Sequence, residues 1–336
     1  MRTSCSFFKQ VVLVAALAAT TPIARGQGRQ DGIPPRIGPY TLSRSLGDSD
    51  EFGRVSSVAV SASGDLVAVL DAYNFRVAVF FGNSTVPVHF GRRGRGPGEF
   101  FHPIDIAVRR GEVLVLDGGN LQVVRIGASE GELTLRGTIP VPFGSPAGTC
   151  TIDNRLFVLG LHAGSLIHEL DDTGAILQSF GTTLPDDPVR GELSATGRLA
   201  CDAGSGRVAH AVSTLNHVAV YSAEGSILSE GRIPGYVRQE YDTSGGLMRP
   251  LRPEGGFIHR IEALQWLPNG TLLVQMAESR RQPAPTREAR VLDVESGWLA
   301  TSPAWPRVLA IVDQRALFYE EAPFPTLKVY DESQRR

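Results

Sequence analysis

The chain has no excess of charge of either sign and very little cysteine. Its 336 residues carry 33 Lys and Arg against 35 Asp and Glu, a formal net charge of −2. A balanced chain offers no bulk electrostatic attraction for DNA or RNA, so nucleic acid is not the expected partner. With only 3 cysteines, the chain cannot be a small scaffold held together by several disulfides.

The sequence also lacks an apolar run long enough to cross a bilayer. Arg2 and Lys9 precede the apolar run Val11–Ala19, and small residues follow it, a pattern typical of a signal peptide. The run is too short for a transmembrane helix. We therefore expect residues 1–26 to be a signal peptide and residues 27–37 a linker. The mature protein is then an exported monomer, periplasmic or extracellular, without a transmembrane segment.

A phosphate-binding loop is missing as well, although the stretch "GRRGRGPG" (residues 91–98) suggests one at first sight. Its glycines do not fit the spacing of that loop, no lysine follows, and a β-rich run rather than a helix comes next. Glycines in this pattern are typical of a turn that needs positive φ. The turn does not explain the arginines Arg92, Arg93 and Arg95, which form a local basic loop without interleaved aromatic residues.

What the sequence does contain is an internal repeat. The segments "LVAVLDAYNFRVAVF" (residues 66–80) and "EVLVLDGGNLQVVRI" (residues 112–126) are the same unit. In both, a β-rich run ends in Leu-Asp, an Asn follows three residues after the Asp, and a second β-rich run comes next. More degenerate copies continue to the C-terminus at a pitch of about 40–50 residues, which is the spacing of propeller blades.

The repeat predicts an all-β, six-bladed β-propeller with four antiparallel strands in each blade, formed by residues 38–336. The last copy lacks a fourth strand, whereas residues 38–47 look like a fourth strand without a blade of their own. We expect this N-terminal strand to complete the last blade, because closure protects the sheet edges. A two-domain β-sandwich is the alternative, and it leaves the orphan strand unexplained. Insertions are expected at residues 235–257 and 278–288.

The segment "FGRRGRGPGEFFHPIDIAVRRGEVLVLDGGNLQVVRI" (residues 90–126) closely resembles an NHL repeat. That family has a Gly-rich turn ending in Gly-Pro-Gly-Glu-Phe, then a Pro, an inner strand and an Asp-x-x-Asn hairpin. Residues 52–80 resemble it less closely, and the likeness fades beyond Pro142, where Gly160 replaces the Asp. The resemblance implies the propeller fold. Some members bind RNA through a basic face, and some related six-bladed enzymes are metal-dependent lyases or lactonases.

In four-stranded blades, the loops between blades share one face of the ring with the hairpins between second and third strands. This face, the loop face, is expected to carry the arginine loop and both insertions, and loops on a rigid scaffold commonly carry function. The residues expected to contact a ligand are Arg92, Arg93, Arg95, Arg198, Tyr236, Tyr241, Arg249 and Arg252. The pairs Asp71/Asn74 and Asp117/Asn120 are expected to stabilise their own hairpins.

An enzymatic alternative rests on two aligned segments, "FFHPIDIA" and "GFIHRIEAL". The alignment matches His102 with His259 and Asp105 with Glu262 where inner strands of blades two and five reach the channel mouth. The matching positions in other blades are Ser57, Thr149 and Arg198. Two His and two carboxylates around one axis are ligands for Zn or Ca. The structural alternative is that these are surface loop histidines, and carboxylates that are hydrogen-bonded to neighbouring strand ends.

The two cysteines after the signal peptide, Cys150 and Cys201, fall on neighbouring inner strands with the same facing. They pair or remain as two buried thiols, and the sequence slightly favours thiols. The preferred function is non-catalytic binding of a protein, peptide or glycan on the loop face, with no cofactor. The alternative is a metal-dependent lyase or lactonase.

Overall fold

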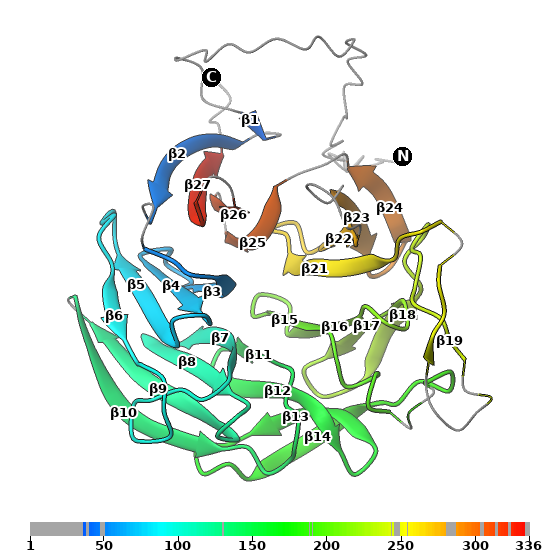
Figure 1. Ribbon diagram of the computed structural model, residues 1–336, viewed down its shortest axis with the longest axis horizontal. Helices are drawn as coiled ribbons and strands as arrows, with labels where there is room; N and C mark the ends of the chain where they lie inside the picture. Colours follow the sequence, from blue (N-terminus) through cyan, green and yellow to red (C-terminus); the bar gives the residue numbers. More distant parts are fainter. Residues whose placement is uncertain are drawn as a thin grey trace, which may run out of the picture.

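The computed structural model describes residues 36–37, 40–47, 51–129, 131–187, 189, 191–242, 244, 249–253, 255–279, 287–302, 306–312, 315–321 and 324–332. The expected signal peptide, nearly all of the linker and most of the insertion 278–288 lie outside these residues. The described chain forms six antiparallel sheets in a ring (Figure 1). The six-bladed β-propeller predicted from the repeat is therefore confirmed. The described residues include no helix that is long and apolar enough to span a bilayer.

Each blade starts at its inner strand and runs outward. The first three blades comprise β3 (Val55–Val60), β4 (Leu66–Asp71), β5 (Arg76–Phe81) and β6 (Val88–Phe90); β7 (Pro103–Arg109), β8 (Glu112–Asp117), β9 (Gln122–Ser129) and β10 (Glu132–Pro140); and β11 (Gly148–Ile152), β12 (Arg155–His162), β13 (Ser165–Leu170) and β14 (Ile176–Thr182).

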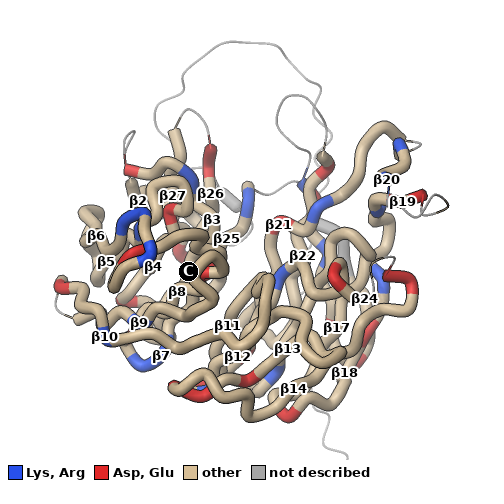
Figure 2. Tube along the Cα trace, turned by 60° about the horizontal axis from the view of Figure 1, so that its bottom comes forward, with Lys and Arg blue, Asp and Glu red and all other residues tan. Residues whose placement is uncertain are grey.

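The next two blades follow the same order. They comprise β15 (Arg198–Asp202), β16 (Arg207–Val212), β17 (His217–Ser222) and β18 (Ile227–Gly231); and β21 (His259–Trp266), β22 (Leu272–Glu278), β23 (Arg287–Asp293) and β24 (Gly297–Ser302). Between them, β19 (Tyr241–Asp242) and β20 (Arg249–Pro250) form a separate two-stranded ribbon at the rim of the ring, away from the central opening (Figures 1 and 2).

The sixth blade joins both ends of the described chain. Its inner three strands are β25 (Arg307–Val312), β26 (Arg315–Glu320) and β27 (Thr326–Glu332), and its fourth is β2 (Tyr40–Leu46), with the two-residue β1 (Arg36–Ile37) outside it. β2 pairs antiparallel with β27 from Tyr40↔Glu332 to Leu46↔Leu327. The orphan strand expected from the sequence thus closes the ring.

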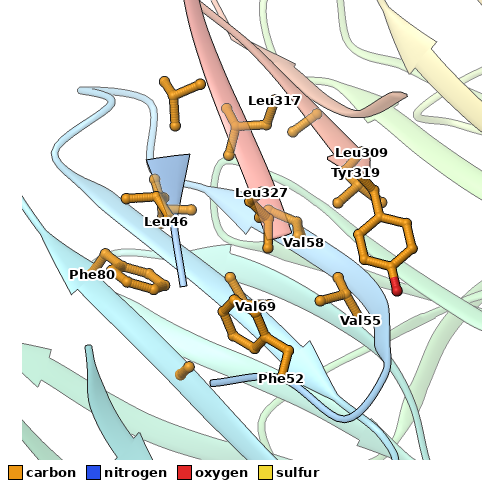
Figure 3. Packing of buried hydrophobic residues seen from close by; sticks show 14 residues of the cluster. Leu46, Phe52, Val55, Val58, Val69, Phe80, Leu309, Leu317, Tyr319 and Leu327 are labelled. Carbon is orange, nitrogen blue, oxygen red and sulfur yellow. The ribbon is translucent and has the colours of Figure 1, made fainter. Parts of the chain in front are cut away.

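The strands are apolar on both faces because each blade packs between two neighbours. In β4, Val67 and Val69 belong to the cluster shared with blade six, whereas Ala68 and Leu70 face blade two. Successive side chains of a strand point to opposite faces, so the run "LVAVL" fills two cores at once. Figure 3 shows the first core, where Leu46 of the closing strand lies with Leu327 and Phe80.

Cys150 and Cys201 form a disulfide between β11 and β15, with their Cα atoms 5.5 Å apart. The preference for free thiols was therefore wrong. The physical reason is convergence: inner strands of neighbouring blades approach each other near the axis, which brings residues of similar register within disulfide range. The sequence predicted that the strands would be adjacent but gave no measure of their spacing.

His210 gives the fold a pH dependence that can be measured. It is buried in β16, and its Nε2 lies 2.9 Å from the Thr196 carbonyl oxygen, so the neutral ring donates this hydrogen bond. Burial lowers the pKa of His210 to about 4. In the unfolded chain the pKa is the ordinary 6.5, so the unfolded state binds the extra proton first as pH falls. The stabilisation is complete above pH 6.5 and is lost progressively toward pH 4, amounting to about 3 kcal/mol.

We expect His210→Gln to flatten the loss of unfolding free energy between pH 7 and pH 4.5. Urea unfolding followed by circular dichroism at both pH values measures it. The exposed His102, changed to Gln, is the control and should keep the wild-type slope. An unchanged slope in His210→Gln would contradict this assignment.

Candidate binding face

The loop face is organised by hydrogen bonds between each inter-blade loop and the hairpin after it. Before blade two, the amides of Phe101 and His102 donate to the carboxylate of Asp117, at 2.9 and 2.7 Å. The side chain of Asn120 donates to the carbonyl oxygen of Gly94 at 3.4 Å. The arginine loop and the β8–β9 hairpin therefore lie on the same face, as the topology of a four-stranded blade requires.

Asp117 and Asp71 are fully buried at the centre of these contacts. Asp117 also accepts hydrogen bonds from the Gly119 amide and from Asn120 Nδ2. In blade one, Asp71 accepts from the Gly53 and Arg54 amides and from Asn74 Nδ2. Each Asp thus binds its own hairpin and, in addition, the backbone that enters the inner strand.

The turn within "GRRGRGPG" also depends on packing. Gly91 has φ +97°, and a Cβ there would come within 2.2 Å of the buried ring of Phe100. Glu99 accepts hydrogen bonds from the Gly96 amide and from Arg92 Nε, both at 2.8 Å, which lower the pKa of this carboxyl. The glycines form a structural turn, and one of the three arginines is part of it.

The other two arginines lie over aromatic rings. The guanidinium carbon of Arg95 is 4.1 Å from the centre of the Phe101 ring, and that of Arg93 is 5.3 Å from the Phe75 ring. The expectation that this loop lacks aromatic neighbours was wrong. Phe75 comes from the β4–β5 hairpin, so only the folded chain brings it to Arg93, whereas Phe101 follows Arg95 closely in sequence and was a usable signal.

Exposed apolar side chains gather on the loop face. Tyr73 is 72% exposed in the β4–β5 hairpin, Leu121 is 42% exposed in the β8–β9 hairpin, and Phe101 is 39% exposed before blade two. Leu251 and Phe324 lie in further loops of the same face. On the opposite face, which we call the turn face, Val86 alone among the described residues is a large exposed apolar side chain. The remaining such side chains lie on outer strands: Leu135, Leu177, Ile227, Leu228 and Leu299.

Some arginines of the two faces differ in whether they have a carboxylate partner. On the turn face, Arg109 is paired with Asp172 at 2.7 Å, and Arg155 with Glu169 at 2.8 Å. Within the described part of the chain, Arg93 and Arg95 have no carboxylate partner. Arg109 and Arg155 are thus neutralised by the protein, whereas Arg93 and Arg95, stacked on the loop face, keep their charge available.

The insertion 235–257 is anchored at its base by Tyr236 and His259. Tyr236 is buried, and its hydroxyl donates to the carbonyl oxygen of His259 at 2.8 Å. The amide of Val237 donates to His259 Nδ1 at 2.8 Å. Tyr236 was expected to contact a ligand, but its ring and hydroxyl are used within the protein. Burial raises the pKa of Tyr236 and lowers that of His259.

Farther out, the insertion forms the β19–β20 ribbon, where Tyr241 is half-buried and Arg249 and Arg252 are exposed. The side chain of neither arginine is hydrogen-bonded or ion-paired within the described residues. Contact of these two arginines with a ligand stays a prediction.

The four residues of the metal hypothesis are held in different surroundings. His102 is exposed, and its backbone is bound by Asp117, whereas His259 is buried at the start of β21, where it accepts a hydrogen bond from the Val237 amide. Glu262 accepts a 2.5 Å hydrogen bond from Arg287. Asp105 accepts from Ser57 Oγ at 2.6 Å and from the Thr149 amide at 2.9 Å. The described residues contain no group of three or more His, Cys, Asp or Glu that could hold a metal ion.

The strand register also differs from the alignment that matched Asp105 with Glu262. Asp105 pairs with Leu116, one residue after the bulge of β7, whereas Glu262 is itself the bulge residue of β21, between Ile261 and Ala263. A bulge shifts the side chains that follow it by one position, and sequence alignment did not detect it. The metal-dependent enzyme stays a prediction.

Comparisons with known proteins identify the fold alone. No family model and no curated protein sequence matches the chain. Among solved structures, hydrazine synthase of Kuenenia stuttgartiensis is similar, with TM-score 0.51 and 11% identity over 81% of this chain and 71% of that one. The propeller domain of Cps50 (Swd1) from Myceliophteria thermophila has TM-score 0.49 and 10% identity, covering 87% of this chain and 99% of that domain.

Proposed function

We propose that this chain is a non-catalytic binding protein whose loop face captures a protein partner. The observation that carries the proposal is the distribution of exposed apolar side chains. Five lie on the loop face and one on the turn face among the described residues. Large contiguous patches of exposed apolar side chains are rare on monomeric proteins, and they are typical of interaction sites.

The kind of side chain supports a protein rather than a solvated surface. Tyr73, Phe101 and Leu121 come from blades one and two, and Arg93 and Arg95 lie beside them over aromatic rings. Aromatic residues and arginine are enriched at the energetic centres of protein interfaces. Their backbone is held by the buried Asp71 and Asp117 networks, so the surface is ordered before a partner arrives and binding costs less entropy.

Two finer assignments belong to the same proposal. The assignment of blades one and two to the NHL type is supported by the contacts of the residues that define the repeat. Phe100 packs on Gly91, and the carboxylate of Asp117 accepts a hydrogen bond from the preceding loop. Export is supported by the pattern of residues 1–26 and by the Cys150–Cys201 disulfide, because disulfides persist mainly outside the reducing cytosol. The partner is then a protein of the periplasm or the extracellular space.

We expect the triple variant Tyr73→Ser, Phe101→Ser, Leu121→Ser to lose its partner. Each interface centre contributes roughly 2 kcal/mol or more, so affinity should fall at least about 100-fold. The tagged protein is cross-linked and purified from its native source. The most enriched protein is then produced separately, and its binding is measured by calorimetry.

The chain offers a matched control, because Leu135, Leu177 and Leu299 are similarly exposed but lie on outer strands. Their triple change to Ser should leave binding unaltered. Retention of the partner by the loop-face variant at wild-type affinity, or its loss from the outer-strand variant, would refute the proposal. Binding of a glycan instead of a protein would preserve the face but replace the partner class.

A further inference from the structure

The central channel is a second candidate binding site, because two arginine side chains in its wall have no carboxylate partner. It is lined by the inner strands of all six blades and has a volume of about 810 Å³. Cavities of roughly 300–1,000 Å³ are the size that takes small organic ligands. An inner strand such as β3, with 6 residues, spans about 20 Å, so a ligand of eight or ten bonds fits along it.

Two arginines at the loop-face end of this channel have no carboxylate partner. The backbone of Arg198 pairs with Ala211 of β16, but its side chain makes no hydrogen bond or ion pair to any described residue. Arg307 donates only to backbone carbonyl oxygens, those of Ser56 at 3.1 Å and Val55 at 3.5 Å, and its buried Nε has no partner among the described residues. Burial, followed by the nearby charge of Arg198, lowers the pKa of Arg307.

The carboxylate of Asp105, whose pKa responds to the charge of Arg198, is already hydrogen-bonded within the protein. Asp105 accepts hydrogen bonds from Ser57, the Thr149 amide and the Ile106 amide, and burial raises its pKa. Arg198 acts on Asp105 as a nearby positive charge that lowers its pKa, without a direct ion pair between the two among the described residues. A guanidinium group left without a counter-ion in a partly buried wall is costly, and a bound anion removes that cost.

The charges at this end of the channel indicate the charge of the ligand. Glu262 is neutralised by Arg287 at 2.5 Å, which leaves Arg198 and Arg307 against the single acidic group Asp105. The excess is one positive charge, which matches a monoanion such as a carboxylate better than a doubly charged phosphate. Below this end both apolar and polar residues line the channel, among them Ala59, Val60, Ser61, Thr151 and Gln265.

We propose that the channel binds a small carboxylic acid, with the carboxylate held by Arg198 and Arg307 and the rest of the molecule lying along the inner strands. A guanidinium fork matches a carboxylate with two parallel hydrogen bonds. The site lies below the loop face and uses none of the exposed side chains assigned to a protein partner, so it does not rest on the function proposed above.

The probe is octanoate, compared with its uncharged counterpart octanamide and with inorganic phosphate, by isothermal titration calorimetry on the full mature chain. We expect octanoate to bind with a Kd below about 1 mM, and octanamide and phosphate at least tenfold more weakly. Arg198→Gln should weaken octanoate at least about tenfold, and Arg198→Lys should recover part of the loss. The control is Arg136→Gln, an exposed arginine of the outer strand β10, which should bind octanoate as the wild type does.

Each other outcome overturns the proposal. Absence of octanoate binding at 10 mM, equal binding of octanamide, or tighter binding of phosphate would each contradict the assignment of a monoanionic carboxylate. Unchanged octanoate affinity in Arg198→Gln, with an unaltered melting temperature to show that the variant is folded, would remove the arginine from the site.

Discussion

A chain that starts at residue 48, and so lacks β1 and β2, should fail to form a stable monomer. Without β2, the sixth blade keeps three strands, the edge of β27 is open, and the core around Leu46 is exposed. Leu46 is fully buried with Leu327 and Phe80 (Figure 3). Losing this side chain alone costs about 2–5 kcal/mol. Together with the lost strand pairing, the cost approaches the total of about 5–15 kcal/mol that stabilises a typical domain.

Circular dichroism melting and size-exclusion chromatography of the shortened chain measure this effect, with a chain starting at residue 36 as reference. We expect loss of the cooperative transition, or aggregation through the free edge of β27. A melting temperature within a few degrees of the reference would show that closure through the N-terminal strand is not a main source of stability.

The same experiment can distinguish a missing strand from general damage. A synthetic peptide of residues 36–47 should restore the transition in trans, because it supplies the edge strand and the Leu46 side chain together. A peptide with Leu42→Asp and Leu46→Asp is the matched control and should not restore it. Leu42 and Leu46 both pair with β27, opposite Tyr330 and Leu327, so the control keeps the backbone and removes only the apolar contacts.

The propeller and its closure were predictable from the sequence because both depend on local pattern. The "LVAVLD" and "EVLVLD" runs mark blades one and two, more degenerate copies follow at the same pitch, and a fourth strand was missing at one end and in excess at the other. A run of apolar residues on both faces of a strand specifies burial between two sheets. This information is carried within each repeat and does not require knowledge of distances.

The candidate sites depended on distances, and there the sequence was less informative. Phe75 reaches Arg93 across two strands, and Cys150 reaches Cys201 across a blade boundary. The bulge at Glu262 displaces it from the position matched with Asp105. The register of the inner strands predicted that Arg198 lies at the channel mouth. That the Arg198 side chain has no partner and lies near Arg307 could be found only once the neighbouring blades were placed around the channel.

Asp117→Ala should be among the most destabilising single changes in this chain. The fully buried carboxylate accepts hydrogen bonds from four groups: Phe101 N (2.9 Å), His102 N (2.7 Å), Gly119 N (3.2 Å) and Asn120 Nδ2 (2.7 Å). Alanine leaves these donors without an acceptor, at about 1–3 kcal/mol for each that stays buried. We expect a loss of about 4 kcal/mol or more in the free energy of unfolding, measured by urea titration.

A surface carboxylate serves as the control for the loss of stability expected in Asp117→Ala. Asp186 pairs with Arg232 at 3.0 Å and Arg238 at 2.6 Å but is exposed, so Asp186→Ala should cost no more than about 1 kcal/mol. Hydrogen exchange adds a local readout: in Asp117→Ala the amides of Phe101 and His102 should exchange faster, and in Asp71→Ala those of Gly53 and Arg54. If Asp117→Ala costs no more than Asp186→Ala, the Asp does not hold the loop. Faster exchange at Phe101 would instead show that the same carboxylate fixes both the fold of blade two and the aromatic ring that Arg95 covers on the binding face.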